Sequence, residues 1–456
     1  MTDKKKLRRI DHRHTVKEFI DELKFSFPNA LNTCEISDVC AFWNSLSHET
    51  LGGKYVYWDE KASVVHAFLF DPDSDDGSAP RHGVSLDLRL QPQDNDIRLA
   101  RATVRIFLSD LRAAPLQKFH DELWDTLKVS RAARIIARLS AFSTGSVLHW
   151  ITTMETASSL KYEGESFQSI VLMSKQPEWI TSAPGAEYIP LRRPLKFRRA
   201  VLEEKWIRAL MRSSSVALHG VSFSGDIVGA VAISRGKIGG KKKVISPSGL
   251  VDVTSLVRNG TMAFVSAPNS DLYVVLPSDM VFGKTQGRWH YFNFSGFRAL
   301  LLRHMPDTLA DALLALLLDL SYSRTGALLC VPDSTASLSK LVPDHSVKLR
   351  PNVDLRLAAA NLRIDAPTHR TFLMAAAGID GAIVISREGV VLDVACMVGE
   401  PTDVELSSLK IRALQRFPGA RSTAAWNASI WGIAIKVSED GPITAFYKGV
   451  LIGQLG

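Results

Sequence analysis

The last third of the chain alternates short β-like runs with helical patterns, and this alternation constrains the fold more than any other feature. A helix is predicted over Thr308–Tyr322 with Asp307 as its cap, and Thr325–Val331 then reads as a strand. A helix, two strands, two helices and two closing strands follow at Thr368–Ala377, Gly381–Ser386, Val390–Cys396, Glu405–Arg416, Ala424–Ile430, Ile433–Ser438 and Ile443–Tyr447. Such alternation predicts an α/β domain with a mixed sheet flanked by helices.

The 456 residues exceed what one hydrophobic core usually organises, so we expect two or three domains. An amino-terminal α+β domain is expected at 1–212, in which Ile97–Leu108 reads as a strand and Thr181–Pro194 as a loop. Short β-runs separated by turn residues predict a β-rich region at 213–305. The mixed α/β domain occupies 306–456.

Composition is that of an ordinary globular protein, with 46% apolar and 22% charged residues. The net charge of +8 permits an anionic partner such as a nucleotide, a nucleic acid or an acidic membrane surface, but the excess is spread along the chain. Three local basic clusters lie at Lys4–Arg9, Arg192–Arg199 and Gly239–Lys243. We interpret each as a solvated tail or loop, because no recognisable nucleic-acid module with interleaved aromatic residues accompanies them.

The four cysteines are too few and too scattered for a disulfide framework. Cys330 and Cys396 lie inside apolar runs, so we expect buried thiols in a reducing compartment. The longest apolar run, Leu309–Leu320, contains two aspartates and is too short to span a bilayer. The charged amino-terminus lacks the apolar segment of a signal peptide. We therefore expect a cytoplasmic protein with no membrane span.

Several local patterns resemble ligand sites but lack a required part. Asp71–Pro80 is acidic but has no downstream glutamate at calcium-loop spacing, so it reads as an exposed loop. Gly283–Thr285 lacks the first glycine of a phosphate loop. Cys34, Cys40 and His48 are spaced too loosely for structural zinc. These patterns predict no site.

Four segments resemble the diadenylate cyclase family in order and approximate spacing. They are a strand after a long helix, an Asp-Gly-Ala turn with its strand, a glycine-led segment before a helix, and a closing Val-Ser-Glu strand: Thr325–Val331, Gly378–Ser386, Gly419–Ala425 and Lys436–Thr444. The Asp380-Gly381-Ala382 turn matches the family's hallmark. The residues from about Leu309 to Gly456 therefore look like a diadenylate cyclase domain.

The resemblance implies a nucleotidyltransferase that condenses two ATP molecules into cyclic di-AMP, with Mg²⁺ or Mn²⁺ as cofactor. One ATP in each of two facing domains implies a homodimer or higher oligomer. Each 3′-hydroxyl attacks the other nucleotide's α-phosphate, so positioning, a metal and cationic clamps do most of the work. The catalytic residues implied are Asp380, which also offers an oxygen to the metal, with Gly381, Ala382 and Arg421. The nucleotide-binding residues implied are Gly419, Ser422, Thr423, Val398 and Ser438.

The third segment departs from the family pattern. The family reads Gly-Thr-Arg-His-Arg where this chain reads Gly-Ala-Arg-Ser-Thr over 419–423. Each lost charge-assisted contact with the triphosphate costs roughly 1.5–3 kcal/mol, unless Lys436, Arg416 or a residue of the amino-terminal region compensates. Read without the family, Asp380 would be a turn aspartate and Arg421 a member of a surface ion pair.

Three functions stay open at this point. The first is a cyclase gated by an amino-terminal sensor, since about 215–303, chiefly around Gly287–Trp289, is similar to the sensor regions that accompany soluble cyclases. The second is a degenerate cyclase domain that binds ATP or a cyclic dinucleotide without making one. The third is a scaffold in which the fold serves oligomerisation alone.

Overall fold

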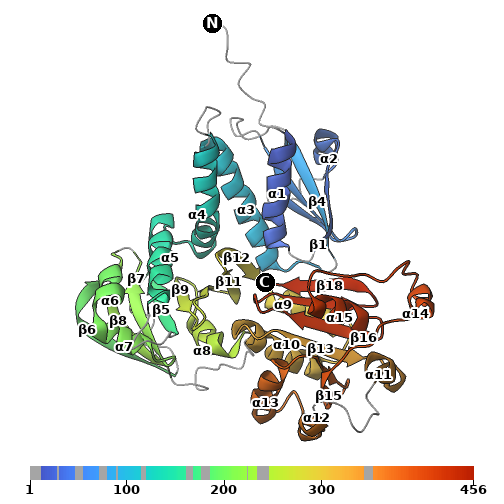
Figure 1. The fold of residues 1–456 in the computed structure, drawn as a ribbon. Helices are drawn as coiled ribbons and strands as arrows, with labels where there is room; N and C mark the ends of the chain where they lie inside the picture. Colours follow the sequence, from blue (N-terminus) through green and yellow to red (C-terminus); the bar gives the residue numbers. More distant parts are fainter. Residues whose placement is uncertain are drawn as a thin grey trace. The chain divides into compact units, whose positions relative to one another are not determined.

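The computed structural model describes residues 12–27, 30–46, 55–70, 80–88, 91–113, 120–160, 168–175, 185–222, 224–233, 246–343 and 353–456. The chain divides into two compact units (Figure 1). Unit 1 comprises residues 1–239, 253–284 and 289–291, and unit 2 comprises 240–252, 285–288 and 292–456. Three sheets with helices confirm the expected mixed α/β class. The clusters at Lys4–Arg9 and Gly239–Lys243, the stretch Asp71–Ala79 and His48 lie outside the described residues.

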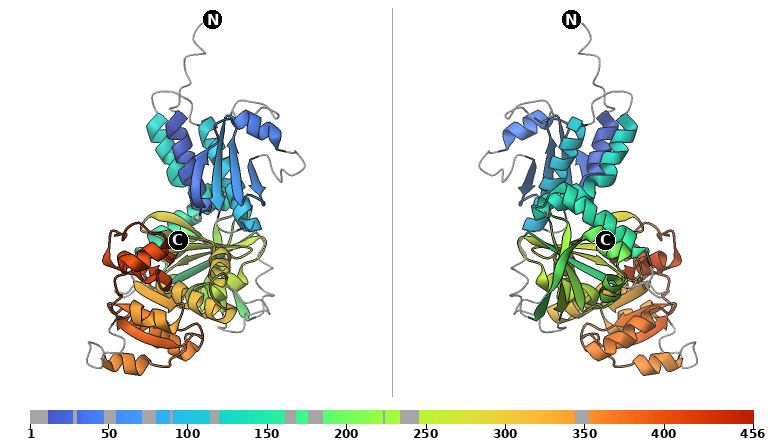
Figure 2. Two further views of the ribbon diagram at one scale, coloured as in Figure 1. Left: turned by 90° about the vertical axis from the view of Figure 1, so that its right-hand side faces the viewer. Right: turned by 90° about the vertical axis from the view of Figure 1, so that its left-hand side faces the viewer.

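Unit 1 begins with an antiparallel sheet of strand order β1-β4-β3-β2. Its strands are β1 (Ala30–Glu35), β2 (Val56–Asp59), β3 (Val64–Leu69) and β4 (His82–Leu88), and the helices around it are α1 (His12–Ser26), α2 (Val39–Ser45), α3 (Asp94–Ala113) and α4 (His120–Ser140). Alternate β3 side chains enter two cores, because Val65 packs with α1 and α3 whereas Phe68 packs against Trp43 of α2. Figure 2 shows the long helices on one side of this sheet.

The second sheet of unit 1 has the strand order β12-β11-β10-β9-β5-β7-β8-β6. Its strands are β5 (Ser169–Ser174), β6 (Ala186–Lys196), β7 (Val216–Val221), β8 (Asp226–Ile233), β9 (Thr261–Ser266), β10 (Leu272–Leu276), β11 (Met280–Thr285) and β12 (Arg288–Phe292). The associated helices are α5 (Thr144–Ser158), α6 (Phe197–Glu203) and α7 (Lys205–Met211), and α8 (Ser248–Leu256) is divided between the two units at residue 253. The expected boundary between residues 212 and 213 falls between β6 and β7, and therefore within one sheet.

Two predictions for unit 1 are wrong. Ile97–Leu108 is not a strand but the middle of α3, because its buried residues Ala100, Val104 and Phe107 recur at helical spacing. Most of the loop predicted over Thr181–Pro194 is β6. This strand tolerates two prolines because it is the edge of its sheet, where a missing N–H leaves no ladder position unpaired.

Unit 2 contains a mixed sheet of order β15-β14-β13-β16-β17-β18, in which β13 and β14 run parallel and the other neighbouring pairs antiparallel. Its strands are β13 (Ala327–Pro332), β14 (Ala382–Ile385), β15 (Val391–Cys396), β16 (Gly432–Val437), β17 (Ile443–Tyr447) and β18 (Val450–Leu455). Its helices are α9 (Phe294–Leu302), α10 (Asp307–Tyr322), α11 (Thr335–Leu341), α12 (Val353–Ala359), α13 (Pro367–Ala377), α14 (Asp403–Ser408) and α15 (Ala420–Ala428). Helix α15 packs on β13, β16 and β17.

The helix predictions for unit 2 hold with three corrections. Pro306, not Asp307, is the N-cap of α10. The helix predicted over Glu405–Arg416 ends at Ser408, because Lys410 adopts a left-handed backbone (φ +60°) that a helix cannot continue through. The short helix predicted from Ala424 begins at Ala420, which places its amino-terminal turn in the predicted glycine-led segment.

Burial of His219 on β7 makes the stability of unit 1 depend on pH. Its side chain is 0% exposed, and Nε2 lies 2.8 Å from the hydroxyl of Ser174 on the adjacent strand. Burial lowers the pKa of His219 from 6.5 to about 4, since the charged imidazolium loses its hydration. The unfolded chain therefore binds a proton between these two values that the folded chain does not.

We predict that the stabilising contribution of the neutral His219 to unit 1 is fully present above pH 6.5 and is lost progressively as the pH falls toward 4. The contribution of His219 is about 3 kcal/mol across this range. Urea unfolding of wild type and His219→Gln at several pH values measures it, and the variant should show a shallower loss of stability. Equal slopes for the two proteins would contradict the assignment.

Candidate functional site

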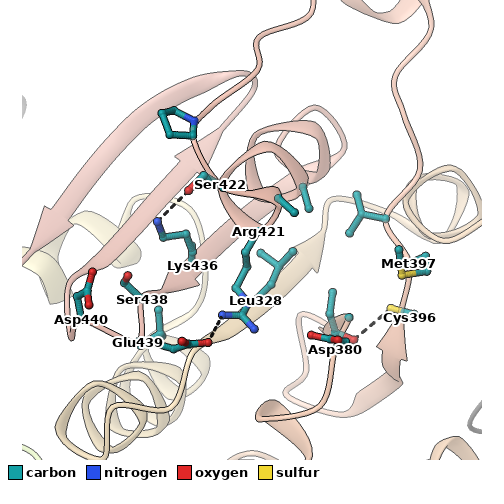
Figure 3. A pocket seen from close by; sticks show the side chains of 18 residues that line it. Leu328, Asp380, Cys396, Met397, Arg421, Ser422, Lys436, Ser438, Glu439 and Asp440 are labelled. Atoms are coloured by element: carbon teal, nitrogen blue, oxygen red, sulfur yellow. Dashed lines mark hydrogen bonds and ion pairs between the residues drawn. The ribbon is translucent and has the colours of Figure 1, made fainter.

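Unit 2 contains a cavity of about 780 Å³ whose walls come from segments far apart in the sequence (Figure 3). It is lined by the start of β14, the end of β15, the first turn of α15 and the end of β16, with Leu328 of β13. The lining residues are Leu328, Asp380–Ala382, Cys396–Val398, Pro418–Ser422, Ala424 and Lys436–Asp440. The four resembling segments are therefore neighbours around one cavity.

Gly381 fits only because it has no side chain. Its φ is +117°, and a Cβ there would lie 2.5 Å from the carbonyl carbon of Ala395 and 2.8 Å from the backbone nitrogen of Cys396. The strands approach this closely beside a register irregularity between Ala382 and Val384. The glycine lets β14 begin against the end of β15, while the preceding Asp380 stays exposed on the cavity wall.

We predict that Gly381→Ala destabilises unit 2 by about 2–4 kcal/mol, because the methyl group meets backbone atoms and the backbone is in the left-handed region. The matched control is Gly378→Ala three residues earlier, where a Cβ would lie 3.5 Å from its nearest neighbour, the carbonyl oxygen of Ala375. Urea unfolding should give a large loss for the first variant and a near-neutral result for the second. Similar losses would contradict the close-approach argument.

The first turn of α15 presents backbone N–H groups at the cavity. Gly419 is the N-cap with φ +97°, and no side chain caps this helix. The amides of Ser422 and Thr423 bond to the carbonyl of Gly419, at 3.2 and 3.4 Å, whereas those of Ala420 and Arg421 have no intrahelical acceptor. A helix amino-terminus of this kind favours a negatively charged ligand.

Arg421 forms an ion pair, as the sequence predicts when the family resemblance is set aside. This pair lies at the cavity. Nη1 of Arg421 donates to Oε1 of Glu439 at 3.3 Å, and Figure 3 shows the guanidinium pointing toward this carboxylate. A Cβ on Gly326 would lie 2.2 Å from that nitrogen, so glycine at 326 leaves room for the pair. Glu439 is 74% exposed. An exposed pair of this kind contributes little to stability, so Arg421 can exchange its partner for an anionic ligand.

Lys436 adds a second cation, which sequence analysis named only as a compensating residue. Its ammonium donates to the hydroxyl of Ser422 at 2.9 Å. Burial and the neighbouring Arg421 cation lower the pKa of Lys436. The signal in the sequence is its spacing, since Lys436 stands two residues before Ser438 and alternate residues of a strand face the same side.

The structure brings together all the sequence-predicted site residues except one. Val398 and Ser438 line the cavity with the Asp380–Ala382 turn, Gly419, Arg421 and Ser422. Thr423 is not among the lining residues, and its hydroxyl bonds instead to the backbone of Phe417, accepting from N–H at 3.0 Å and donating to the carbonyl at 3.3 Å. Thr423 therefore stabilises the loop before α15.

The cavity has carboxylates but no preformed metal cage. Within the described ranges, no three His, Cys, Asp or Glu side chains gather as metal ligands. Asp380, Glu439 and Asp440 line the cavity; Glu439 pairs with Arg421 and Asp440 accepts a hydrogen bond from Gln286. Mg²⁺ is often bound by one or two carboxylates with substrate phosphates and water. The exposed carboxylate of Asp380 is one such oxygen donor at the cavity wall.

Comparisons with known proteins give little. No protein-family model matches the chain. No curated protein matches it either. Among solved structures, the chain is similar to the hypothetical membrane spanning protein from Bacillus cereus, with 18% identity over 35% of this chain and 67% of that chain and a TM-score of 0.25. None of the described helices is long and apolar enough to cross a membrane.

Proposed function

We propose that the unit 2 cavity binds ATP and that the domain around it is a diadenylate cyclase, which joins two ATP molecules into cyclic di-AMP. The observation that carries the proposal is that sequence segments far apart in the chain meet at one cavity. Four segments singled out by sequence resemblance line one cavity of about 780 Å³, with an exposed aspartate, a helix amino-terminus and two cations. This volume is within the range of about 300–1,000 Å³ that small-molecule sites occupy.

The polar side of the cavity suits the triphosphate. Backbone N–H groups of α15, the Arg421 guanidinium and the Lys436 ammonium offer positive charge to the cavity. A guanidinium binds phosphate oxygens in pairs, and an ammonium adds a point charge. The apolar lining residues Leu328 and Val398 suit the adenine. Phosphate binding would replace Glu439 as the partner of Arg421.

The proposed reaction asks little covalent chemistry of the protein. Each 3′-oxygen forms a bond to the α-phosphorus of the other ATP while the bond from that phosphorus to the pyrophosphate oxygen breaks. Asp380 accepts the hydroxyl proton or holds the divalent metal, which supplies positive charge at the phosphates when bound. Arg421 and Lys436 hold the pyrophosphate leaving group. Two copies of the domain face each other during the reaction, since each nucleotide is both nucleophile and target.

We predict that Lys436→Gln weakens ATP binding by about tenfold or more, because a charge-assisted contact with phosphate contributes roughly 1.5–3 kcal/mol. Lys410→Gln is the matched control, since Lys410 is exposed and does not line the cavity. Isothermal titration calorimetry of both variants with ATP and Mn²⁺ measures the difference. Equal affinities for wild type and Lys436→Gln would remove this lysine from the triphosphate site.

A specific observation favours a second candidate, a nucleotide-binding domain without catalysis. Ala420, Ser422 and Thr423 differ from the cyclase pattern, and Thr423 bonds to Phe417 instead of facing the cavity. The cations left are Arg421 and Lys436. Such a site can hold a triphosphate with affinity yet fail to align two nucleotides for in-line attack.

The deciding experiment incubates the full chain with ATP and Mn²⁺ or Mg²⁺ and identifies products by mass spectrometry. We predict cyclic di-AMP from wild type, and at least about a hundredfold less from Asp380→Asn, as expected for loss of a proton acceptor or metal ligand. Circular dichroism checks that the variant is folded.

No product from wild type with either metal overturns the cyclase proposal, and thermal stability then separates the remaining functions. A ligand at a hundred times its dissociation constant adds about 2.7 kcal/mol to the folded state. Stabilisation by ATP without product supports the non-catalytic binder. Absence of both product and stabilisation supports the oligomerisation scaffold.

A further inference from the structure

We infer that Gln286 is a positioning residue for the unit 2 cavity, because its side chain holds the turn that carries the carboxylates of Glu439 and Asp440. Gln286 does not line the cavity itself. It directly follows Gly283–Thr285, the segment that lacks the first glycine of a phosphate loop. Gln286 and both carboxylates belong to unit 2. The inference rests on the nucleotide site proposed above and concerns how that site is held.

The backbone conformation of Gln286 is not one that turn chemistry favours for a glutamine. Strands β11 and β12 are joined by two residues, Gln286 with φ +47° and Gly287 with φ +78°. Two-residue hairpin turns of this kind need positive φ at both central positions, where asparagine, aspartate and glycine are the usual residues. A left-handed residue that local geometry does not favour points to a function of its side chain.

The side chain of Gln286 reaches the turn between β16 and β17. Its Nε2 donates to Oδ1 of Asp440. Within this turn, the N–H of Gly441 donates to the carbonyl of Ser438 at 2.9 Å. The buried hydroxyl of Ser321 on α10 donates to the carbonyl of Gly441. The turn is therefore anchored at Gly441 by α10 and at Asp440 by Gln286.

The two carboxylates of this turn act on the two cations of the cavity. Glu439 pairs with Arg421 at 3.3 Å (Figure 3). Burial and the Arg421 cation lower the pKa of Lys436, whereas Asp440 raises it, because a nearby carboxylate favours the charged ammonium. The hydrogen bond from Gln286 holds Asp440 at the edge of the cavity, which leaves Lys436 available to a phosphate group.

The most informative variant is Gln286→Asn. Asparagine adopts a left-handed backbone readily, but its side chain is one methylene shorter and ends short of Asp440. Urea unfolding should show a variant at least as stable as wild type. Calorimetry with 3′-deoxy-ATP and Mn²⁺ should show binding weaker by about tenfold, because the released Asp440 competes with phosphate for Lys436. A purely structural role in the turn predicts unchanged affinity.

The matched control is Ser278→Asn. Ser278 also has a left-handed backbone, with φ +66°, in the turn at the other end of β11, and it does not line the cavity. Its nucleotide affinity should equal that of wild type.

A double-mutant cycle with Asp440→Ala tests whether Gln286 acts through Asp440. In the Asp440→Ala background, Gln286→Asn should cause no further change in nucleotide affinity. In the nucleotide-free protein, Asp440→Ala should cost less stability when Gln286→Asn is already present. This second measurement needs no nucleotide. If wild type binds no nucleotide, the proposed function is overturned, while coupling in the nucleotide-free protein still supports Gln286 as the residue that positions the turn.

Three results overturn the inference itself. The first is wild-type nucleotide affinity in Gln286→Asn. The second is an equal loss of affinity from Gln286→Asn with and without Asp440. The third is strict additivity of the two substitutions in the urea unfolding of the nucleotide-free protein, since residues that do not interact give additive changes.

Discussion

The close approach of β14 to β15 at Gly381 is the constraint on which the unit 2 site depends. Gly381 has φ +117° and no room for a Cβ, so β14 begins directly against the end of β15. This contact sets Asp380 on one wall of the cavity and Val398 on the next. Strand β13 pairs with β14 on one edge and with β16 on the other. The same sheet therefore also positions Lys436 of β16. The position of the aspartate therefore follows from backbone packing.

The two cations of the cavity have weak partners in the structure. Arg421 is paired with the exposed carboxylate of Glu439, and Lys436 donates to the neutral hydroxyl of Ser422. Neither partner neutralises its cation strongly, because an exposed ion pair contributes little free energy and a hydroxyl carries no charge. Burial and the Arg421 cation lower the pKa of Lys436, which indicates a place where added negative charge would be favourable. In the proposed function, the triphosphate of ATP would provide that charge.

Sequence reasoning predicted most strands and helices of unit 2, because its apolar runs are short and bounded by turn residues. The site residues were implied by the resemblance to the diadenylate cyclase family, and all but Thr423 line one cavity. Sequence reasoning misplaced the start of α15, since the first turn has polar residues and begins at a glycine with positive φ. It missed β18, α11 and α12. It read α3 as a strand because a short apolar window does not distinguish the two periods. Thr423 could not be predicted, since its bond to Phe417 depends on the folded loop.

A crystal structure of the chain with 3′-deoxy-ATP and Mn²⁺ tests the nucleotide site most directly. This nucleotide can bind but cannot react, because it lacks the attacking 3′-hydroxyl. We predict the triphosphate at the first turn of α15, with Arg421 turned from Glu439 toward phosphate oxygens and Asp380 beside the metal. The adenine should lie against Leu328 and Val398. A nucleotide bound outside this cavity, or an unchanged Arg421–Glu439 pair with the cavity free of nucleotide at saturating concentration, would contradict this prediction.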